Sequence, residues 1–173
     1  MILPWVLGAE PLVGDVLEIG SGSGAMAAAA VERFPDVRFT ATDADPAMVD
    51  AATTRLAPLG DRADVRLADS TALDFADDRF DAVLSFLMLH HVLEWEQALA
   101  EVVRVVRPGG YFIGYDLLDT PPARLIHRLD GSAHHLFPLS ALRAAVAGLP
   151  VETLEVAAGL GGLVARFRLR TDG

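Results

Sequence analysis

A glycine-rich turn near the start of the chain is the feature with the clearest chemical implication. Residues 16–19 are apolar apart from Glu18 and resemble a buried strand, and Gly20-Ser21-Gly22-Ser23-Gly24 then leads into an alanine-rich segment. Side chains in such a turn would block the approach of a cofactor to the backbone. The turn therefore predicts a site for a nucleoside cofactor.

Two acidic residues stand where such a cofactor needs polar partners. Asp43 ends the second predicted strand, 23 residues after Gly20, where a carboxylate can accept hydrogen bonds from both ribose hydroxyls. Its alternative role is to cap the next helix, although Asp45 already fills that position. Glu18 precedes the turn. An acid at this position would repel a pyrophosphate, but it is compatible with a cofactor that carries an ammonium group and a sulfonium group. Glu18 could also stabilise the loop by accepting backbone hydrogen bonds.

The glycine spacing alone leaves two cofactor classes open. Gly20, Gly22 and Ala25 also fit the G-x-G-x-x-A pattern of nicotinamide-binding sites. A nicotinamide-dependent oxidoreductase is therefore an alternative, and the acid at position 18 is the residue that argues against it.

The chain has five histidines, all after the fourth predicted strand, in segments expected at the edge of the sheet where α/β proteins bind ligands. His90 and His91 are adjacent at a helix start, about 100° apart, so only one can point squarely at a reacting group. Either could act as a general base near neutral pH, or the pair could be structural. The spacing of His127, His134 and His135 matches no standard ligand pattern, so we predict no metal site.

The sequence also predicts the elements that position these residues. Apolar runs alternate with helix-period segments, which indicates an α/β fold with helices on both faces of a parallel sheet. The predicted strands are 15–20, 37–42, 64–68, 80–86 and 110–116, followed by 151–156 and 163–169. A short glycine-containing link joins the last two, so one of them should be antiparallel to the rest. The predicted helices are 24–34, 45–57, 95–106, 121–129 and 140–147.

Composition excludes several classes of function. With 173 residues, 52% of them hydrophobic, the chain can form one domain over 1–173 around its own core. It lacks cysteine and lysine, which removes disulfides, thiolate metal sites and Schiff-base chemistry. The formal charge of -10 argues against a nucleic-acid partner. No apolar run approaches the roughly 18 residues that span a bilayer, so we expect a cytoplasmic protein with no membrane partner.

Six ordered segments together resemble the class I S-adenosylmethionine-dependent methyltransferase superfamily. The segments are Leu17-Glu18-Ile19-Gly20-Ser21-Gly22-Ser23-Gly24, Asp43, Ala68-Asp69-Ser70, residues 80–85, Leu89-His90-His91-Val92 and residues 105–110. They are most similar to the branch with ubiquinone/menaquinone-biosynthesis and small-molecule methyltransferases. The resemblance implies S-adenosylmethionine as cofactor and a Rossmann-like three-layer sandwich, with a mostly parallel seven-stranded sheet and an antiparallel C-terminal strand.

The resemblance also implies roles for individual residues. Glu18 would lie near the methionine amino group, Asp43 would bind the ribose diol, and Asp69 would accept a hydrogen bond from the adenine amino group. Asp69 could instead be a plain turn residue. Ser85 and Phe86 would line the reacting methyl group. The candidate catalytic residues are His90 and His91, and the implied cofactor-binding set is Glu18, Gly20, Ser21, Gly22, Gly24, Asp43, Ala44, Ala68, Asp69, Ser70, Ser85 and Phe86.

We therefore predict methyl transfer to a small-molecule acceptor by in-line displacement at the sulfonium carbon. A non-catalytic S-adenosylmethionine-binding module is the second hypothesis. About 14 residues precede the first predicted strand, fewer than in similar proteins, so we expect an open site. A homodimer partner, a large acceptor or the segment 121–135 could cover it. That segment carries leucines on one face and arginines on another, which suits either a lid or a solvated amphipathic helix.

Overall fold

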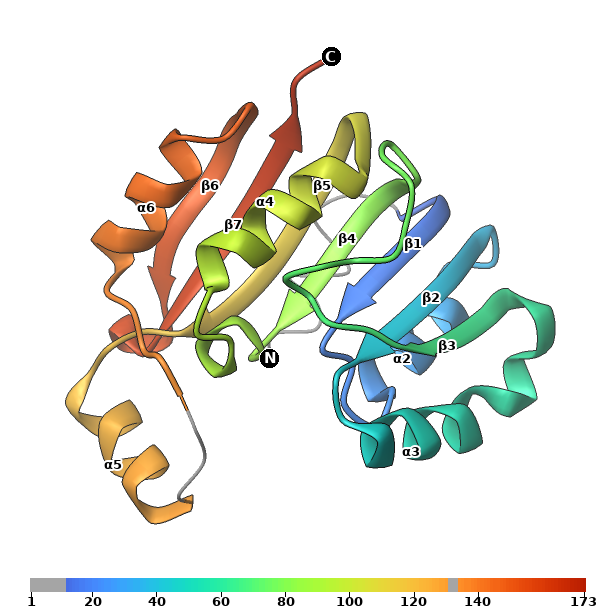
Figure 1. Ribbon diagram of the computed structural model, residues 1–173, viewed down its shortest axis with the longest axis horizontal. Coiled ribbons are helices and arrows are strands. Elements are labelled where there is room, and N and C mark those ends of the chain that lie inside the picture. Colours follow the sequence, from blue (N-terminus) through green and yellow to red (C-terminus); the bar gives the residue numbers. More distant parts are fainter. Residues whose placement is uncertain (1–11, 131–133) are drawn as a thin grey trace.

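The protein is described by a computed structural model over residues 12–130 and 134–173, without the side chains of Ile126, His127 and Asp130 (Figure 1). The strands form one seven-stranded sheet in the order β3-β2-β1-β4-β5-β7-β6. In that order they are β3 (Ala63–Leu67), β2 (Val37–Asp43), β1 (Gly14–Ile19), β4 (Phe80–Phe86), β5 (Val106–Leu117), β7 (Val164–Thr171) and β6 (Val151–Gly159). β7 runs antiparallel to β5 and β6 on either side of it, while the other described pairs are parallel, which confirms the predicted architecture.

Helices cover both faces of the sheet (Figure 1). On one face, α2 (Ala25–Arg33) and α3 (Pro46–Leu56) enclose a cluster that includes Val31, Phe39 and Leu84. On the other, α4 (Trp95–Val105) and α6 (Leu139–Ala147) enclose a second cluster that includes Leu99 and Phe112. The two clusters explain the adjacent apolar residues Val16-Leu17 in β1 and Ala82-Val83-Leu84 in β4, since each strand is buried on both faces.

The parallel strands all end at one edge of the sheet, the lower edge in Figure 1. After β1 the chain crosses to β2 and β3 on one side, and it returns through β4 to β5 on the other. Ligands of open α/β sheets bind at the carboxyl ends of the strands where this reversal of strand order occurs. The fold therefore places the candidate site between β1 and β4. The helix α5 (Pro121–Asp130) projects beyond the same edge.

The predicted boundary between the helix 95–106 and the strand 110–116 is wrong by four residues. The helix α4 ends at Val105 and β5 begins at Val106, so the strand β5 includes Pro108 and Gly109. Val106 pairs with Phe80 before the register shifts in an irregularity of the ladder. Such bulges accommodate proline and left-handed glycine inside a strand, and Gly109 has a φ of 76°.

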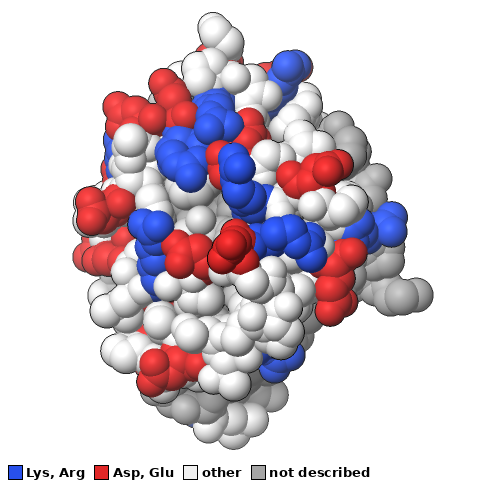
Figure 2. All heavy atoms as spheres, turned by 90° about the vertical axis from the view of Figure 1, so that its right-hand side faces the viewer, with Lys and Arg blue, Asp and Glu red and all other residues white. Residues whose placement is uncertain are grey.

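Three of the remaining links contain short 3-10 helices. They are η1 (Ala57–Arg62), η2 (Leu89–His91) and η3 (Leu160–Gly162), of which η3 joins β6 to β7. Within the described residues, no helix is both long and apolar enough to cross a bilayer. Figure 2, seen from the side of α3 and β3, shows basic and acidic side chains interspersed over that face.

Candidate functional site

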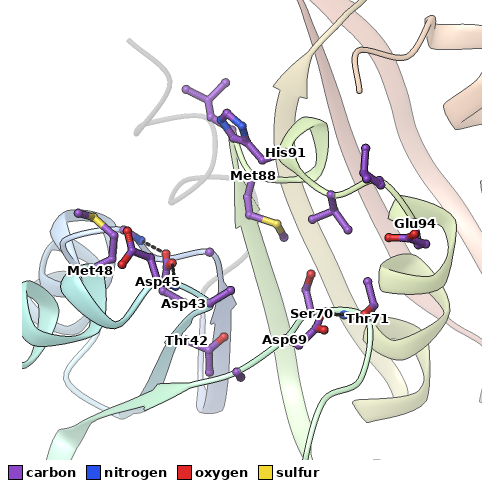
Figure 3. A pocket seen from close by; sticks show the side chains of 17 residues that line it. Thr42, Asp43, Asp45, Met48, Asp69, Ser70, Thr71, Met88, His91 and Glu94 are labelled. Carbon is purple, nitrogen blue, oxygen red and sulfur yellow. Dashed lines mark hydrogen bonds between the residues drawn. The ribbon is translucent and has the colours of Figure 1, made fainter. Parts of the chain in front are cut away.

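A cavity of about 750 Å³ opens at the carboxyl edge of the sheet, between the end of β2 and the loop after β4 (Figure 3). Its volume lies in the range of small-molecule sites. The lining residues are Gly20, Gly22, Thr42, Asp43, Ala44, Asp45, Met48, Ala68, Asp69, Ser70, Thr71, Leu87, Met88, His91, Val92, Leu93 and Glu94.

The three glycines of the turn have left-handed backbones, with φ of 65° at Gly20, 53° at Gly22 and 77° at Gly24. A Cβ at Gly20 would lie 2.0 Å from Cγ of Met88, and one at Gly24 would lie 3.2 Å from Cβ of Ala52. A Cβ at Gly22 would meet nothing within 4 Å. Gly20 and Gly24 therefore permit close packing, whereas Gly22 leaves room on the cavity wall for a ligand.

Asp43 ties the glycine turn to the end of β2. Its Oδ2 accepts a hydrogen bond from the Gly22 amide at 2.8 Å, and its Oδ1 accepts one from the Asp45 amide at 3.0 Å. The cap of α3 is Asp45, whose carboxylate accepts a hydrogen bond from the Ala47 amide. Since each carboxylate oxygen has a second lone pair, Asp43 can still accept hydrogen bonds from a diol in the cavity.

Glu18 lies beneath the glycine turn and is only 1% exposed. Burial raises the pKa of its carboxyl group to about 8; a hydrogen bond with the Ala27 backbone opposes this shift, and the charge of Asp43 adds to it. Its Oε2 has no hydrogen-bond partner among the described residues. A buried acceptor without a partner is costly, and the carboxyl group, when ionised, contributes a negative charge close to the glycine turn.

Asp69 also lines the cavity, away from Asp43, at the start of the connection from β3 to β4 (Figure 3). Its Oδ1 accepts hydrogen bonds from the amide and the hydroxyl of Thr71, at 2.8 and 2.7 Å. These bonds hold the pKa of the carboxyl group below its usual value. Asp69 is therefore both a turn residue and a lining residue of the cavity, so the two roles considered for it are compatible.

Polar residues of α4 form hydrogen bonds to the backbone of Thr71 and Leu73, and so hold in place the segment that carries Asp69. Gln97 donates a hydrogen bond to the Thr71 carbonyl at 2.9 Å, and Glu101 accepts one from the Leu73 amide at 2.8 Å. Arg104 donates to the Leu73 carbonyl and pairs with Glu101. Because only the apolar stripe of the helix has a recognisable period, the sequence gives no sign of this role.

The structure separates the two adjacent histidines. His91 lines the cavity, whereas His90 is 3% exposed and its Nδ1 is hydrogen-bonded to the buried carboxylate of Asp116. The two rings contact each other, with centroids 4.1 Å apart. Of the two, His91 therefore lies on the cavity wall and His90 in the interior.

The cavity brings together part of the predicted set. Eight predicted residues line it, namely Gly20, Gly22, Asp43, Ala44, Ala68, Asp69, Ser70 and His91. The six others are buried and do not line it, namely Glu18, Ser21, Gly24, Ser85, Phe86 and His90.

Two of these six were expected to face the reacting methyl group. Ser85 is fully buried, and its Oγ has no partner within the part of the chain that the structure describes. Phe86 packs against Tyr115, with ring centroids 5.3 Å apart. The residues that reach the cavity after β4 are instead Leu87 and Met88, which sequence reasoning missed because the left-handed Leu87, with a φ of 54°, redirects the chain.

The segment 121–135 contributes the helix α5, which leaves Leu125 and Leu129 exposed by 57% and 80%. Arg124 on the same helix forms an ion pair with Asp119. Residues 131–133 and the side chain of His127 lie outside the described residues. Among those described, no group of three acidic or histidine side chains could hold a metal ion.

Comparison with known proteins agrees with this geometry. Residues 17–114, more than half of the chain, match the family described as "Methyltransferase domain". The ubiquinone/menaquinone biosynthesis C-methyltransferase UbiE of Desulfotalea psychrophila is 36% identical over 117 residues, which cover 68% of this chain and 46% of the relative. The demethylmenaquinone methyltransferase of Clavibacter sepedonicus is 35% identical and is covered to 47%. The chain thus spans about half the length of these curated relatives.

Solved structures share the fold at low sequence identity. The [4+2]-cyclase SpnF superposes with a TM-score of 0.84 at 16% identity, over 99% of this chain and 80% of that one. The geranyl diphosphate C-methyltransferase of Streptomyces coelicolor A3(2), solved with Mg²⁺, geranyl diphosphate and S-adenosyl-L-homocysteine, superposes with a TM-score of 0.82 at 13% identity, over 98% and 76%.

The glycine turn, the acid-lined cavity and the matched segment all indicate S-adenosylmethionine as the cofactor. The open wall at Gly22 and the unpartnered Glu18 oxygen fit its polar groups. The chain belongs to the methyltransferase domain family, within the class I S-adenosylmethionine-dependent superfamily.

Proposed function

We propose that this protein transfers the methyl group of S-adenosylmethionine to a small-molecule acceptor with an apolar part. The observation that carries the proposal is the cavity itself, whose lining combines the open wall at Gly22 with the carboxylates of Asp43 and Asp69. Family membership and the methyltransferase names of the curated relatives support the reaction class.

Four residues would hold the cofactor. The Asp43 carboxylate would bind the ribose diol, Asp69 would accept from the adenine amino group, and the Ser70 amide would donate to a ring nitrogen. Glu18, with its unpartnered buried oxygen, would attract the methionine ammonium group. When bound, the cofactor supplies an electrophilic methyl group on a positively charged sulfur. The residues of the chain then need chiefly to hold the acceptor atom in line, at about 3–3.5 Å from that methyl group.

The rim of the cavity supports an acceptor that is partly apolar. Met48, Leu87 and Leu93 line the cavity and are 36%, 42% and 62% exposed. Exposed apolar groups around a polar site favour a ligand that buries hydrocarbon on binding. One curated relative is named for ubiquinone/menaquinone biosynthesis, another for demethylmenaquinone, and one structural neighbour for geranyl diphosphate, which is consistent with an acceptor of this kind.

A base is needed only if the acceptor atom must lose a proton. Of the two candidate histidines, His91 is the one on the cavity wall, so we assign it the role of base. His90 would act through its neighbours, since its ring is buried beside Asp116. A base in this position contributes about 10²- to 10⁴-fold to the rate when proton removal limits the reaction.

A specific observation supports a second function, cofactor binding without methyl transfer. The cyclase SpnF has the same fold, so the fold does not fix the reaction. In addition, Ser85 and Phe86 do not line the cavity. Membership of the methyltransferase family, by contrast, removes the support for a nicotinamide-dependent oxidoreductase.

Incubation with methyl-labelled S-adenosylmethionine distinguishes these functions. The acceptor pool would be a cell extract divided into a solvent-soluble lipid fraction and an aqueous metabolite fraction. We expect label to enter a product from the lipid fraction, with little labelling by the Asp43→Ala variant. Tight binding of S-adenosylhomocysteine with no labelled product in either fraction would instead favour the binding module.

A further inference from the structure

Asp116, near the end of β5, is a fully buried carboxylate with a dense set of hydrogen bonds. Its Oδ2 accepts from the amides of Met88 and Leu89 at 2.9 and 2.6 Å. Its Oδ1 accepts from the Leu117 amide at 2.7 Å and is hydrogen-bonded to Nδ1 of His90. Asp116 is 0% exposed and His90 is 3% exposed. Three of these four groups belong to the loop that follows β4.

The loop after β4 needs stabilising contacts from other segments, because the backbone of its first residue is strained. Leu87 has a φ of 54°, a left-handed conformation that costs about 1–2 kcal/mol for a residue with a branched side chain. Its amide donates a hydrogen bond to the Tyr115 carbonyl at 2.9 Å. Two successive residues of β5, Tyr115 and Asp116, therefore secure three successive amides of the loop.

The loop in turn forms one wall of the cavity. Met88 fills the space that the missing side chain of Gly20 leaves, and both Met88 and His91 line the cavity. In Figure 3 these two side chains lie across the cavity from Asp43 and Asp69. A shift of the Met88 and Leu89 backbone would therefore change the shape of the cavity, although Asp116 itself does not line it.

We propose that Asp116 is a positioning residue for the methyl-transfer site, which holds the 87–91 loop in the conformation that places Met88 and His91 on the cavity wall. The inference rests on the proposed function, in that the cavity is taken to be the cofactor site. Asp116 also fixes the tautomer of His90. An ionised carboxylate has no proton to donate and can only accept hydrogen bonds, so Nδ1 of His90 carries the proton of this pair.

A buried carboxylate could stabilise the protein without any effect on the site, so the test must separate the two roles. The variant Asp116→Asn keeps one oxygen for the Met88 and Leu89 amides but places its NH2 group against His90 and the Leu117 amide, which loses its acceptor. Nδ1 of His90 can accept a hydrogen bond from that group only if the ring proton moves to Nε2. The variant Asp116→Ala loses every hydrogen bond. Leu169→Ala is the matched control, because Leu169 is 1% exposed in β7 and does not line the cavity.

The readouts are calorimetric titration with S-adenosylhomocysteine and the nitrogen-15 spectrum of the histidine rings. We expect Asp116→Ala to weaken binding by about 10- to 100-fold and Asp116→Asn by less. Asp116→Asn should move the His90 proton from Nδ1 to Nε2. Leu169→Ala should lower the unfolding midpoint yet keep affinity within about twofold of the wild type.

The proposal is overturned if Asp116→Ala folds and binds with wild-type affinity. It is also overturned, without any variant, if wild-type His90 carries no proton on Nδ1 or if the Met88 and Leu89 amides exchange as fast as exposed ones. Failure of the wild type to bind S-adenosylhomocysteine would count against the proposed function instead. The His90 tautomer and the amide exchange would still be measurable in that case.

Discussion

The carboxylate of Asp43 accepts a hydrogen bond from the backbone amide of Gly22 at 2.8 Å. This bond joins the acid at the end of β2 to the middle glycine of the turn after β1. Both residues line the cavity, and their relative position is therefore set before any ligand binds. Preorganisation of this kind reduces the free-energy cost of ordering the site on binding.

Asp43→Ala should weaken S-adenosylhomocysteine binding by about 1–3 kcal/mol, because charge-assisted hydrogen bonds to the ribose diol are lost. Titration calorimetry measures this directly. The control is Asp50→Ala, which removes an exposed carboxylate on α3 that does not line the cavity and should leave the affinity unchanged. Equal losses of affinity in the two variants would mean that the ribose is held elsewhere.

Gly22→Ala should impair binding in a way that a comparable glycine substitution does not. Gly22 and Gly161 both have a left-handed φ, 53° and 66°, and a Cβ at either would meet nothing within 4 Å. Each alanine variant should therefore lose about 1 kcal/mol of stability from the strained backbone. Only Gly22 lines the cavity, so only Gly22→Ala should lose affinity for S-adenosylhomocysteine. Similar affinities for the two variants would argue against a ligand at this wall.

Glu18 should make stability and cofactor affinity depend on pH in opposite directions. Its pKa rises from 4.5 to about 8 on folding, so the folded state binds this proton more tightly than the unfolded state. The associated stability is present below about pH 4.5 and is lost as the pH rises through about 8, by an amount on the order of 5 kcal/mol. Affinity for the ammonium-bearing ligand should increase over the same window, as Glu18 ionises.

The control for this prediction is Glu18→Gln, which cannot ionise. Urea unfolding at several pH values should show that the variant gains stability relative to the wild type as the pH rises. Calorimetry should show a nearly flat pH dependence of S-adenosylhomocysteine affinity for the variant. Parallel pH profiles for the two proteins would show that ionisation of Glu18 does not cause the pH dependence of stability and affinity.

Arg104→Leu should loosen the wall that carries Asp69. The variant removes the hydrogen bond to the Leu73 carbonyl and the pair with Glu101, whose pKa Arg104 holds below its usual value. We expect a loss of about 1–3 kcal/mol in unfolding free energy and weaker binding of S-adenosylhomocysteine. Glu96→Gln, on the exposed side of the same helix, should change neither quantity. An Arg104→Leu protein with unaltered affinity would exclude this supporting role.

Most of the fold could be predicted because its signals are local. Continuous apolar runs indicate strands buried on both faces, and Asp45-Pro46 marks a helix start that the structure confirms. Asp43 was also predictable as a lining residue, since residues at the ends of parallel strands share one edge of the sheet. The position of Asp69 followed from the family resemblance.

The burial of His90 and Phe86 could not be predicted, because it depends on tertiary contacts. His90 turns inward to meet Asp116, 26 residues away in sequence. Phe86 stays in the core because the left-handed Leu87 redirects the chain only after it. Neither contact leaves a periodic or compositional signal in the sequence.

The central claim is that the cavity binds the methyltransferase cofactor, and calorimetric titration with S-adenosylhomocysteine and, separately, NADH tests it most directly. We predict saturable binding of S-adenosylhomocysteine to one site, lost or weakened in Asp43→Ala, and no binding of NADH. Binding of NADH without binding of S-adenosylhomocysteine would contradict the account.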